Sequence, residues 1–474
     1  MHTSHLCSLF FSSNWLLVFF ISIYIYIYIY IYEMEVDTGV ERVIPSQNVK
    51  TVINPNLPSL NQLMEIDGSI DLRKKIYVYP EPSDINNLGP IDFVVHETPG
   101  YYLDLASITV DAKIRLLSAQ GDREGHADWN SYFINNLSQS LWSTIKVSLN
   151  NTNIESNYYN QQLANLHHIL STPNIIVKER GLVQGAFPVE TDTLKDTLDN
   201  AHMAVEGIVE RVNFAKQNVI HLTAPLQLDL SSATKYLSDG INVKITLEPS
   251  SPLFLIKRSD AAGAAKINHK FSIENIRLLV NKIKPSDGVL ISESKRLMNR
   301  PFEYVIRRNL VKETVFPAGQ SELSISRPFQ AVIPNKLYIF MVKQSAARGS
   351  YHRHPFFYGH NNLLSYSVKL DGLEIAGHET SDGFVQSYVE SLRAHGEDYF
   401  IPYATFKESC FVLCVDTNQG SDLNTLAVER RGNLQLTLRM RGALAESLLI
   451  YVVGAVDSTF EIDANKSVTT LYQY

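Results

Sequence analysis

Three histidines lie close together in the second half of the chain, at His352, His354 and His360. Imidazoles two positions apart on an extended segment share a face, so one zinc ion could use both as ligands. No cysteine and no clear carboxylate nearby completes a set of four ligands, and we therefore interpret these residues as ordinary loop histidines. The adjacent His167 and His168 fall in a helical pattern, where neighbouring side chains point apart, and they predict no metal site.

A second concentration of polar residues is the stretch 121–128, which contains Asp122, Glu124, His126 and Asp128. These side chains could bind calcium or act in acid–base chemistry, but the stretch lacks the glycine and the ligand spacing of a calcium loop. A solvated surface loop is the favoured interpretation. The sequence also has no phosphate-binding glycine loop, no Gly-x-Ser-x-Gly and no convincing Cys–His pair. We therefore predict no catalytic, cofactor-binding or metal-binding residues, no cofactor, and no enzyme.

Basic residues gather near the C-terminal end, at Arg430, Arg431, Arg439 and Arg441. On a strand, Arg439 and Arg441 share one face, which could meet a neighbouring subunit or DNA, although a solvated face is favoured. The formal net charge of −7 argues against a large surface for nucleic acid.

Cysteine is scarce, with Cys7, Cys410 and Cys414 as the complete set. Cys410 and Cys414 lie four positions apart, which on a strand is about 13 Å and too far for a direct disulfide. Buried free thiols in a reducing compartment are the simplest interpretation.

The elements that would position these residues have a β pattern, which is clearest in Trp142–Leu149. Apolar and polar residues alternate there, the turn Asn150-Asn151 tolerates positive φ, and Ile154 follows. A near-copy occurs in the second half, where Ser365–Leu370 precedes Asp371-Gly372 and Ile375. One strand–turn–strand signature in each half predicts two copies of one β-domain. We expect Ile145, Val147 and Leu149 to fill the first core, and Tyr366, Val368 and Leu370 the second.

Further alternating segments predict many short strands. Gly240 and Gly432 each open such a segment late in their own half. We expect helices at Tyr158–Leu170, near Leu60–Leu72, and at Thr191–Glu206, the last ending at Gly207. The expected strands are Asp92–His96, Tyr102–Leu105, Ile108–Leu116, Ala224–Leu230, Gly240–Leu247, Phe271–Val280, Glu303–Arg307, Leu337–Val342, Cys410–Val415, Gly432–Leu438 and Leu448–Val456.

The absence of a βαβ rhythm favours an all-β fold of two tandem eight-stranded antiparallel jelly rolls, with long loop insertions and a few short helices. A length of 474 residues also suits two domains. The expected divisions are an N-terminal extension (1–33), an arm (34–90), a first jelly roll (91–256), a linker (257–270) and a second jelly roll (271–474).

Residues 1–33 have an unusual composition. Trp15–Tyr32 is apolar enough for a membrane span or a signal sequence, but Ile23–Tyr32 is five Ile-Tyr pairs, which an AT-dinucleotide repeat would encode. The stretch has neither a basic n-region nor a small-residue cleavage site. We expect Met34 to be the natural start and residues 1–33 to be an extension of the gene model.

The order of these segments resembles the double jelly-roll major capsid proteins of Polinton/Maverick elements and adintovirus-like viruses. The resemblance covers about residues 70–470. At 354–358 the chain has His-Pro-Phe-Phe-Tyr in place of the family's Asn-Pro-Phe-Asn-Phe-like run. The segments that carry the resemblance are Tyr101–Leu105, Ile134–Asn150, Tyr158–Leu170, Arg327–Gln330, Ile333–Leu337, His354–Leu363, Val368–Gly372, Gly432–Leu434, Leu444–Leu448 and Ile450–Val452.

This resemblance implies a structural capsid protein of a virus or an integrated viral element. Three copies would form a pseudo-hexagonal capsomer of an icosahedral shell around double-stranded DNA. The implied partners are further copies and a penton or minor capsid protein, with no sequence-specific nucleic acid and no membrane. The implied location is the virion, after synthesis in the host cytoplasm, with the nucleus as one place of assembly. The alternative is an enzyme or carbohydrate-binding protein on a double β-sandwich, secreted if the apolar N-terminal segment is real.

Overall fold

The computed structural model describes residues 69–81, 88–118, 120–122, 130–258, 269–380, 383–396, 399–418 and 430–472. All of them belong to one compact unit, Asp67–Tyr474. The residues outside this description include the expected extension (1–33) with Cys7, most of the arm, residues 259–268 of the expected linker, and residues 123–128 of the acidic stretch.

Two four-stranded antiparallel sheets form a first sandwich. One sheet has the order β1-β10-β3-β7 and the other β2-β8-β5-β6. The strands are β1 (Ile70–Val78), β10 (Lys270–Pro285), β3 (Tyr102–Leu117), β7 (Ile220–Pro225), β2 (Ile91–Val95), β8 (Val243–Pro249), β5 (Trp142–Leu149) and β6 (Thr152–Asn157).

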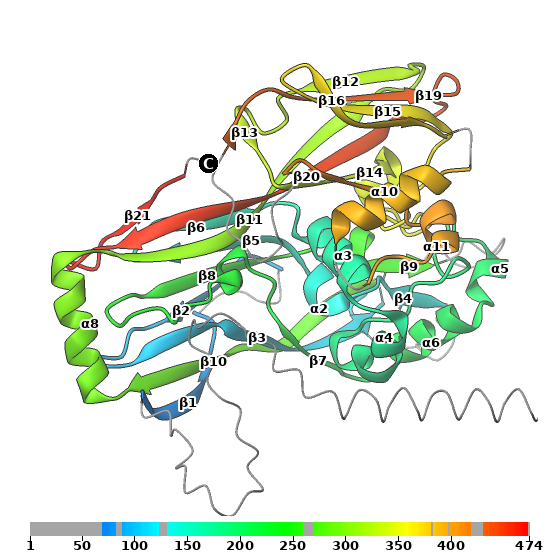
Figure 1. The fold of residues 1–474 in the computed structure, drawn as a ribbon. Helices are drawn as coiled ribbons and strands as arrows, with labels where there is room; N and C mark the ends of the chain where they lie inside the picture. Colours follow the sequence, from blue (N-terminus) through cyan, green and yellow to red (C-terminus); the bar gives the residue numbers. More distant parts are fainter. Residues whose placement is uncertain are drawn as a thin grey trace, which may run out of the picture. The chain divides into compact units, whose positions relative to one another are not determined.

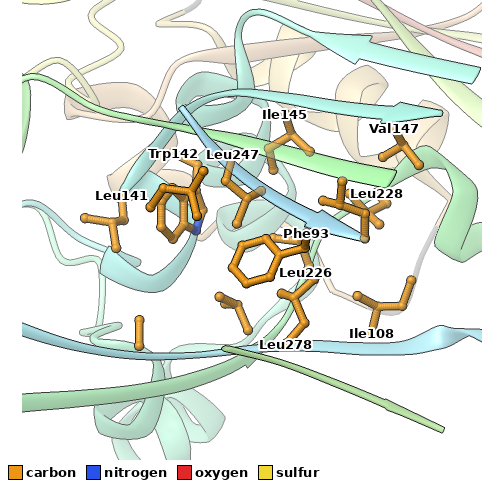
Figure 2. Close-up of a cluster of buried hydrophobic side chains, with 14 of the residues drawn as sticks. Phe93, Ile108, Leu141, Trp142, Ile145, Val147, Leu226, Leu228, Leu247 and Leu278 are labelled. Carbon is orange, nitrogen blue, oxygen red and sulfur yellow. The ribbon is translucent and has the colours of Figure 1, made fainter. Parts of the chain in front are cut away.

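The first sandwich is held together by aliphatic and aromatic side chains that point inward from both sheets (Figure 2). Phe93 and Ile145 come from one sheet, and Ile108 and Leu278 from the other. Inward and outward positions alternate along these strands, because successive side chains of a strand point to opposite faces. The hydrophobic effect of this shared interior stabilises the stacking of the two sheets.

A second sandwich repeats this arrangement. One sheet has the order β11-β20-β14-β17, with β21 beside β20, and the other has the order β12-β19-β15-β16. The chain is therefore a double jelly roll of two eight-stranded antiparallel sandwiches (Figure 1). The strands of the second sandwich are β11 (Phe302–Phe316), β20 (Leu448–Ile462), β14 (Lys336–Lys343), β17 (Val412–Asp416), β21 (Val468–Thr470), β12 (Glu322–Ser326), β19 (Leu434–Met440), β15 (Leu363–Leu370) and β16 (Leu373–Glu379). Two further two-stranded ladders pair β4 (Ser131–Phe133) with β9 (Ile256–Arg258) and β13 (Val332–Ile333) with β18 (Arg430–Arg431).

The two hairpins predicted from the sequence occupy the same place in the two sandwiches. β5 lies between the edge strand β6 and β8, and β15 lies in the same way between the edge strand β16 and β19. Both contain a register shift, after Val147 in β5 and after Val368 in β15. Asn150 and Asn151 have φ of 43° and 69°, as a tight hairpin turn requires. The duplicated signature is therefore confirmed, and the strands that begin after Gly240 and Gly432 are the matching neighbours β8 and β19.

The expected core residues lie inside with one exception. Ile145, Val147 and Leu149 are fully buried, and Tyr366 and Val368 are buried in the second core. Leu370 is half-buried instead, because it is the last residue before the turn at Asp371.

The structure differs from the sequence prediction at the boundary between the sandwiches. The segment Phe271–Val280, expected to open the second jelly roll, lies in β10, which is hydrogen-bonded between β1 and β3 of the first. Its alternate residues enter the first core. The expected arm likewise contributes a strand, since β1 pairs with β10, and Ile70–Leu72 is extended rather than helical. On this pairing we propose that the first jelly roll extends to Pro285 and the second begins at Phe302.

The helices lie mainly in the insertion between β6 and β7 and at the same end of the second sandwich (Figure 1). The expected helix at Tyr158–Leu170 is confirmed as α3. The expected helix at Thr191–Glu206 is confirmed only in the short α5 (Asn200–Met203). Gly207 does not end it but lies inside α6, where a Cβ would approach Thr193 Cγ2 to 2.9 Å. The helices are α2 (Leu137–Ser140), α3 (Asn160–Ser171), α4 (Asn174–Arg180), α5 (Asn200–Met203), α6 (Glu206–Ala215), α7 (Pro252–Leu255), α8 (Asp287–Asn299), α9 (Gln344–Ala347), α10 (Val385–His395) and α11 (Tyr403–Glu408), with 3-10 turns η3 (Gly181–Gln184) and η4 (Asp229–Ser232).

Candidate functional site

The three histidines singled out in the sequence do not form one site. His354 is fully buried, and its Nδ1 accepts a hydrogen bond from the Phe356 backbone N–H at 3.2 Å. His352 Nδ1 lies 3.3 Å from the Arg258 carbonyl oxygen. His360 packs against the Phe384 ring at 4.7 Å between centroids. Among the described residues, no group of three His, Cys, Asp or Glu side chains is placed to hold a metal ion.

His354 belongs instead to a buried group of basic side chains between the helical insertion and the second sandwich. Burial, with the charges of Lys257, Arg211 and His202, holds the pKa of His354 well below its usual value. Burial also lowers the pKa of His202 to about 4 and that of Lys257 to about 7. The Lys257 ammonium donates to the carbonyl oxygens of Leu253 and Ser350. The His202 and His354 imidazoles are therefore neutral near pH 7, whereas Arg211 keeps its charge and Lys257 is close to half protonated.

The C-terminal arginines are bound within the chain. Arg439 Nε lies 3.2 Å from Glu322 Oε2, and Arg441 donates to the Thr380 carbonyl oxygen. Arg430 donates to the Thr417 carbonyl oxygen. These contacts favour a structural role over a surface for DNA.

Cys410 and Cys414, the two cysteines that the structure describes, are buried and are not joined in a disulfide, as expected. Burial raises the pKa of the Cys410 thiol to about 12, so the thiolate needed for a nucleophile is scarce at neutral pH.

A pair of carboxyl groups at the junction of the two sandwiches was not predicted. Glu155 on β6 is buried, and its Oε2 accepts from the Leu230 backbone N–H at 3.3 Å. Asp229 on η4 accepts from the backbone and side-chain amides of Asn309 on β11, at 3.3 and 2.9 Å. The two acids line a cavity of about 830 Å³ with residues of both sandwiches.

Burial dominates the electrostatics of this pair. It raises the pKa of Asp229 to about 6, and burial together with the Asp229 charge raises the pKa of Glu155 well above its usual value. Two carboxyl groups with raised pKa values that line one cavity could act as acid and base. Both Asp229 oxygens, however, accept hydrogen bonds from β11, so the structure uses this group to join the first sandwich to the second.

Sequence reasoning missed the pair for a definite reason. Ala224–Leu230 alternates like a strand, which would turn Asp229 outward, but the chain leaves β7 at Pro225 and forms η4 at Asp229. Nothing local in the sequence marks the approach of Glu155.

Large aliphatic side chains are exposed in the helical insertion. Ile175 and Ile176 on α4 and Leu182 and Val183 on η3 are between 43% and 69% exposed. Exposed apolar surface is a common feature of protein contact sites. Among the described residues, no helix is both long and apolar enough to cross a membrane.

Comparisons with known proteins identify the fold. No family model matches the sequence. Among curated proteins, the uncharacterized protein F54H12.2 of Caenorhabditis elegans is 23% identical over 175 residues, which is 36% of this chain and 41% of that relative, so the match spans less than half the length of either protein.

Solved structures match over nearly the whole chain. A chain of the Sputnik virophage structure has a TM-score of 0.56 at 13% identity and covers 91% of this chain and 95% of its own length. The mavirus major capsid protein has a TM-score of 0.51 at 12% identity, covering 92% and 98%, and the Faustovirus major capsid protein has 0.55 at 9%, covering 88% and 94%. The chain therefore has the double jelly-roll fold found in viral major capsid proteins.

Proposed function

We propose that this chain is a major capsid protein that trimerises into pseudo-hexagonal capsomers. The observation that carries the proposal is the duplicated eight-stranded sandwich, in which β5–β6 and β15–β16 occupy matching places. Three copies of a chain with two similar sandwiches supply six similar units around a threefold axis, which is the shape of a pseudo-hexagon. The almost complete coverage of the mavirus capsid chain supports this proposal.

The proposal extends to the shell and its contents. Such capsomers would tile an icosahedral shell around a double-stranded DNA genome, with a penton or minor capsid protein at the fivefold vertices. The net charge of −7 suits a shell whose genome is neutralised by a separate basic protein. The expected location is the virion, after synthesis in the host cytoplasm and assembly there or in the nucleus. No membrane contact is required of the mature protein.

Within capsid proteins, we propose an affiliation with Polinton/Maverick elements and adintovirus-like viruses. The ordered motifs from Tyr101 to Val452 support it, and partial identity to a nematode protein fits an element integrated in an animal genome. Neighbouring genes test this affiliation. A packaging ATPase, a cysteine protease and a protein-primed polymerase beside the gene are expected, and a neighbourhood of metabolic genes would contradict it.

The trimer is tested by size-exclusion chromatography with light scattering on the full chain and on residues 34–474. We expect a mass three times that of the chain, stable on dilution to micromolar concentration. A monomer at every concentration would contradict the proposal.

A second candidate function is an enzyme or carbohydrate-binding protein, and the observation in its favour is the Glu155–Asp229 pair beside the 830 Å³ cavity. A survey of glycoside hydrolysis with the wild-type chain and with Glu155→Gln separates the two functions. Turnover that the substitution abolishes would establish the enzyme, and equal absence of turnover in both is what the capsid proposal expects.

A further inference from the structure

One arginine of the helical insertion is buried without a negative partner. Arg211 on α6 is 1% exposed, and its Nη2 donates to the Pro188 carbonyl oxygen at 3.1 Å. Its guanidinium carbon lies 5.5 Å from the centre of the Phe187 ring, and its Nε and Nη1 have no hydrogen-bond partner in the protein. Burial lowers the pKa of Arg211, but a guanidinium keeps its proton inside proteins. A full positive charge therefore lies in the interior.

The described acids do not neutralise this charge. Glu190 and Glu210 lie near enough for their charges to act on the guanidinium, yet both are exposed, and neither forms an ion pair with it. The acids of the interior, Asp111 on β3 and the Glu155–Asp229 pair at the junction of the sandwiches, are hydrogen-bonded to other groups. A buried charge without a counter-charge is very costly. The described side chains therefore lack the negative group that this guanidinium requires.

A second buried donor without a partner belongs to a loop of the second sandwich. His354 is 1% exposed, and the Phe356 backbone N–H donates to its Nδ1 at 3.2 Å. Since Nδ1 accepts, the proton of the neutral ring is on Nε2, which has no hydrogen-bond partner in the protein. The ring is neutral, because burial, with the charges of Lys257 and Arg211, holds its pKa well below the usual value. The unsatisfied atoms of Arg211 and His354 are therefore all donors, and both side chains lack an acceptor.

Side chains from several elements surround Arg211. After burial, the Arg211 charge is among the causes that lower the pKa of His168 on α3 and of His202 on α5, each to about 4. It also acts on His354 in the loop before β15. Tyr132 on β4 belongs to the same group, since its Oη lies 3.3 Å from His202 Nε2. Figure 1 shows α6 beside β4 and β9, and α6 contacts β4. Basic groups of three helices and one loop therefore meet in one buried region.

A lysine adds to this region from β9. Lys257 is fully buried and lies opposite Tyr132 on the β4–β9 ladder. Its ammonium donates to the Leu253 and Ser350 carbonyl oxygens at 3.0 and 2.6 Å, which uses two of its three donors. Burial lowers its pKa to about 7, so it adds part of a positive charge near neutral pH. The region thus has an excess of both donors and positive charge.

We propose that a small monovalent inorganic anion of the halide class binds in this region, between the Arg211 guanidinium and the Nε2–H of His354. An anion accepts from both donors and balances the guanidinium charge, whereas a water molecule accepts a hydrogen bond and leaves the charge unbalanced. The anion is small, because the side chains around it are at most 8% exposed. It is monovalent, because Arg211 alone among these side chains carries a full charge near pH 7. The site is independent of whether the chain forms trimers.

An anion at this place joins parts of the chain that are distant in sequence. α6 belongs to the insertion of the first sandwich, and His354 belongs to the second. Near it, the Leu198 N–H donates to the His352 carbonyl oxygen at 2.9 Å, and the Lys343 ammonium lies 2.6 Å from the Asp196 carboxylate. A ligand that binds the folded chain and not the unfolded one raises the apparent stability as its concentration rises. Chloride should therefore stabilise the fold.

Thermal unfolding of the full chain tests the site. Sodium chloride is raised from about 10 to about 500 mM against sodium gluconate at constant ionic strength, because gluconate is too large for the enclosed region and keeps the screening equal. The wild-type melting temperature should rise by about 1–2 °C for each tenfold increase in chloride, as linkage predicts for one site in a chain of this length. Arg211→Met, which keeps an unbranched side chain and removes the charge, should abolish this rise.

Two further variants separate the site from general effects of salt. The matched control is Arg296→Met on α8, where the arginine side chain is 64% exposed and lies 3.9 Å from Glu293. This control should keep the full response to chloride. His354→Phe keeps a ring in place and removes the Nε2–H donor. It should raise the dissociation constant for chloride at least about tenfold, as loss of a hydrogen bond to a charged group does.

Crystals of the wild-type chain grown with sodium bromide locate the anion directly. We expect an anomalous peak beside Arg211 and His354. Density there without anomalous signal would show a water molecule and overturn the proposal. A chloride response that is absent from the wild type, or that Arg211→Met retains, would overturn it too. A bromide peak without any chloride response in solution would mean binding at crystal concentration only, which also contradicts the site. If Arg211→Met does not fold, the bromide crystals and His354→Phe decide.

Discussion

An aspartate placed at the inward positions of the two matching hairpins should prevent folding. Val147 on β5 and Val368 on β15 are both fully buried, and they lie opposite Ile245 and Leu436 on the neighbouring strands. Val147→Asp and Val368→Asp each put a carboxyl group where no polar partner is available. The two substitutions probe the two cores separately.

The expected loss of stability can be worked from three contributions. Protonating a buried aspartate at pH 7, about three pH units above its ordinary pKa, costs about 4 kcal/mol. Loss of the apolar burial of valine costs about 1.5–2 kcal/mol. The protonated carboxyl, without a hydrogen-bond partner, costs about 1–3 kcal/mol more. The total of about 6.5–9 kcal/mol is comparable to the whole stability of a typical domain, about 5–15 kcal/mol.

The assay is soluble yield followed by circular dichroism and size-exclusion chromatography. We expect both variants to be insoluble or unfolded, with no trimer. The matched control is Ser148→Asp, one position along β5, where the side chain is half-buried and lies opposite Lys244, so a carboxylate there can find a cation. If Val147→Asp and Val368→Asp melted within a few degrees of the control, the assigned strand faces would be wrong.

Three further predictions concern packing, the C-terminal segment and pH. Gly454→Ala should lower the free energy of unfolding, measured by chemical denaturation, by about 1–3 kcal/mol, because the new Cβ would lie 2.8 Å from a proline ring. Gly288→Ala in α8, where the new Cβ has no neighbour within 4 Å, should instead raise it by up to about 1 kcal/mol. Tyr472→Ala should lower the free energy of unfolding by about 1–3 kcal/mol in the same assay, because it removes the hydrogen bond to the Ile154 carbonyl oxygen on β6 and the cation–π contact with Arg308 at 4.0 Å. An unchanged denaturation midpoint would show that the C-terminal segment does not hold the sandwiches together. Burial lowers the pKa of His202 to about 4 and that of His354 well below its usual value, so both histidines bind protons only on unfolding. Their contribution to stability is therefore complete above about pH 6.5 and is lost as the pH falls toward 4, by about 2 kcal/mol for His202 at pH 5. The Glu155–Asp229 pair changes stability in the opposite direction, so the difference in unfolding free energy between His202→Gln and wild type, measured at pH 7.5 and at pH 5, isolates the histidine, and an equal difference at both pH values would refute the assignment.

Local signals in the sequence account for the parts of the fold that could be predicted. Asn150-Asn151 and Asp371-Gly372 specify tight turns without help from distant residues, and the alternation before each turn sets which face is buried. The recurrence of that hairpin predicted the duplication.

Long-range pairing explains what could not be predicted. The segment Phe271–Val280 alternates like any half-buried strand, and only its partners β1 and β3 assign it to the first sandwich. Gly207 could equally end a helix or allow close packing, and the approach of Thr193 decides between them. The Glu155–Asp229 pair depends on a junction between the two sandwiches, which no sequence window contains.

The central claim, a capsomer of six similar sandwiches from three copies of this chain, is tested most directly by electron cryo-microscopy of the purified full chain at micromolar concentration. The account predicts particles with a threefold axis and six β-sandwiches around it, two from each copy, with β5–β6 and β15–β16 at alternating equivalent places. Isolated particles of two sandwiches at every concentration examined would contradict it.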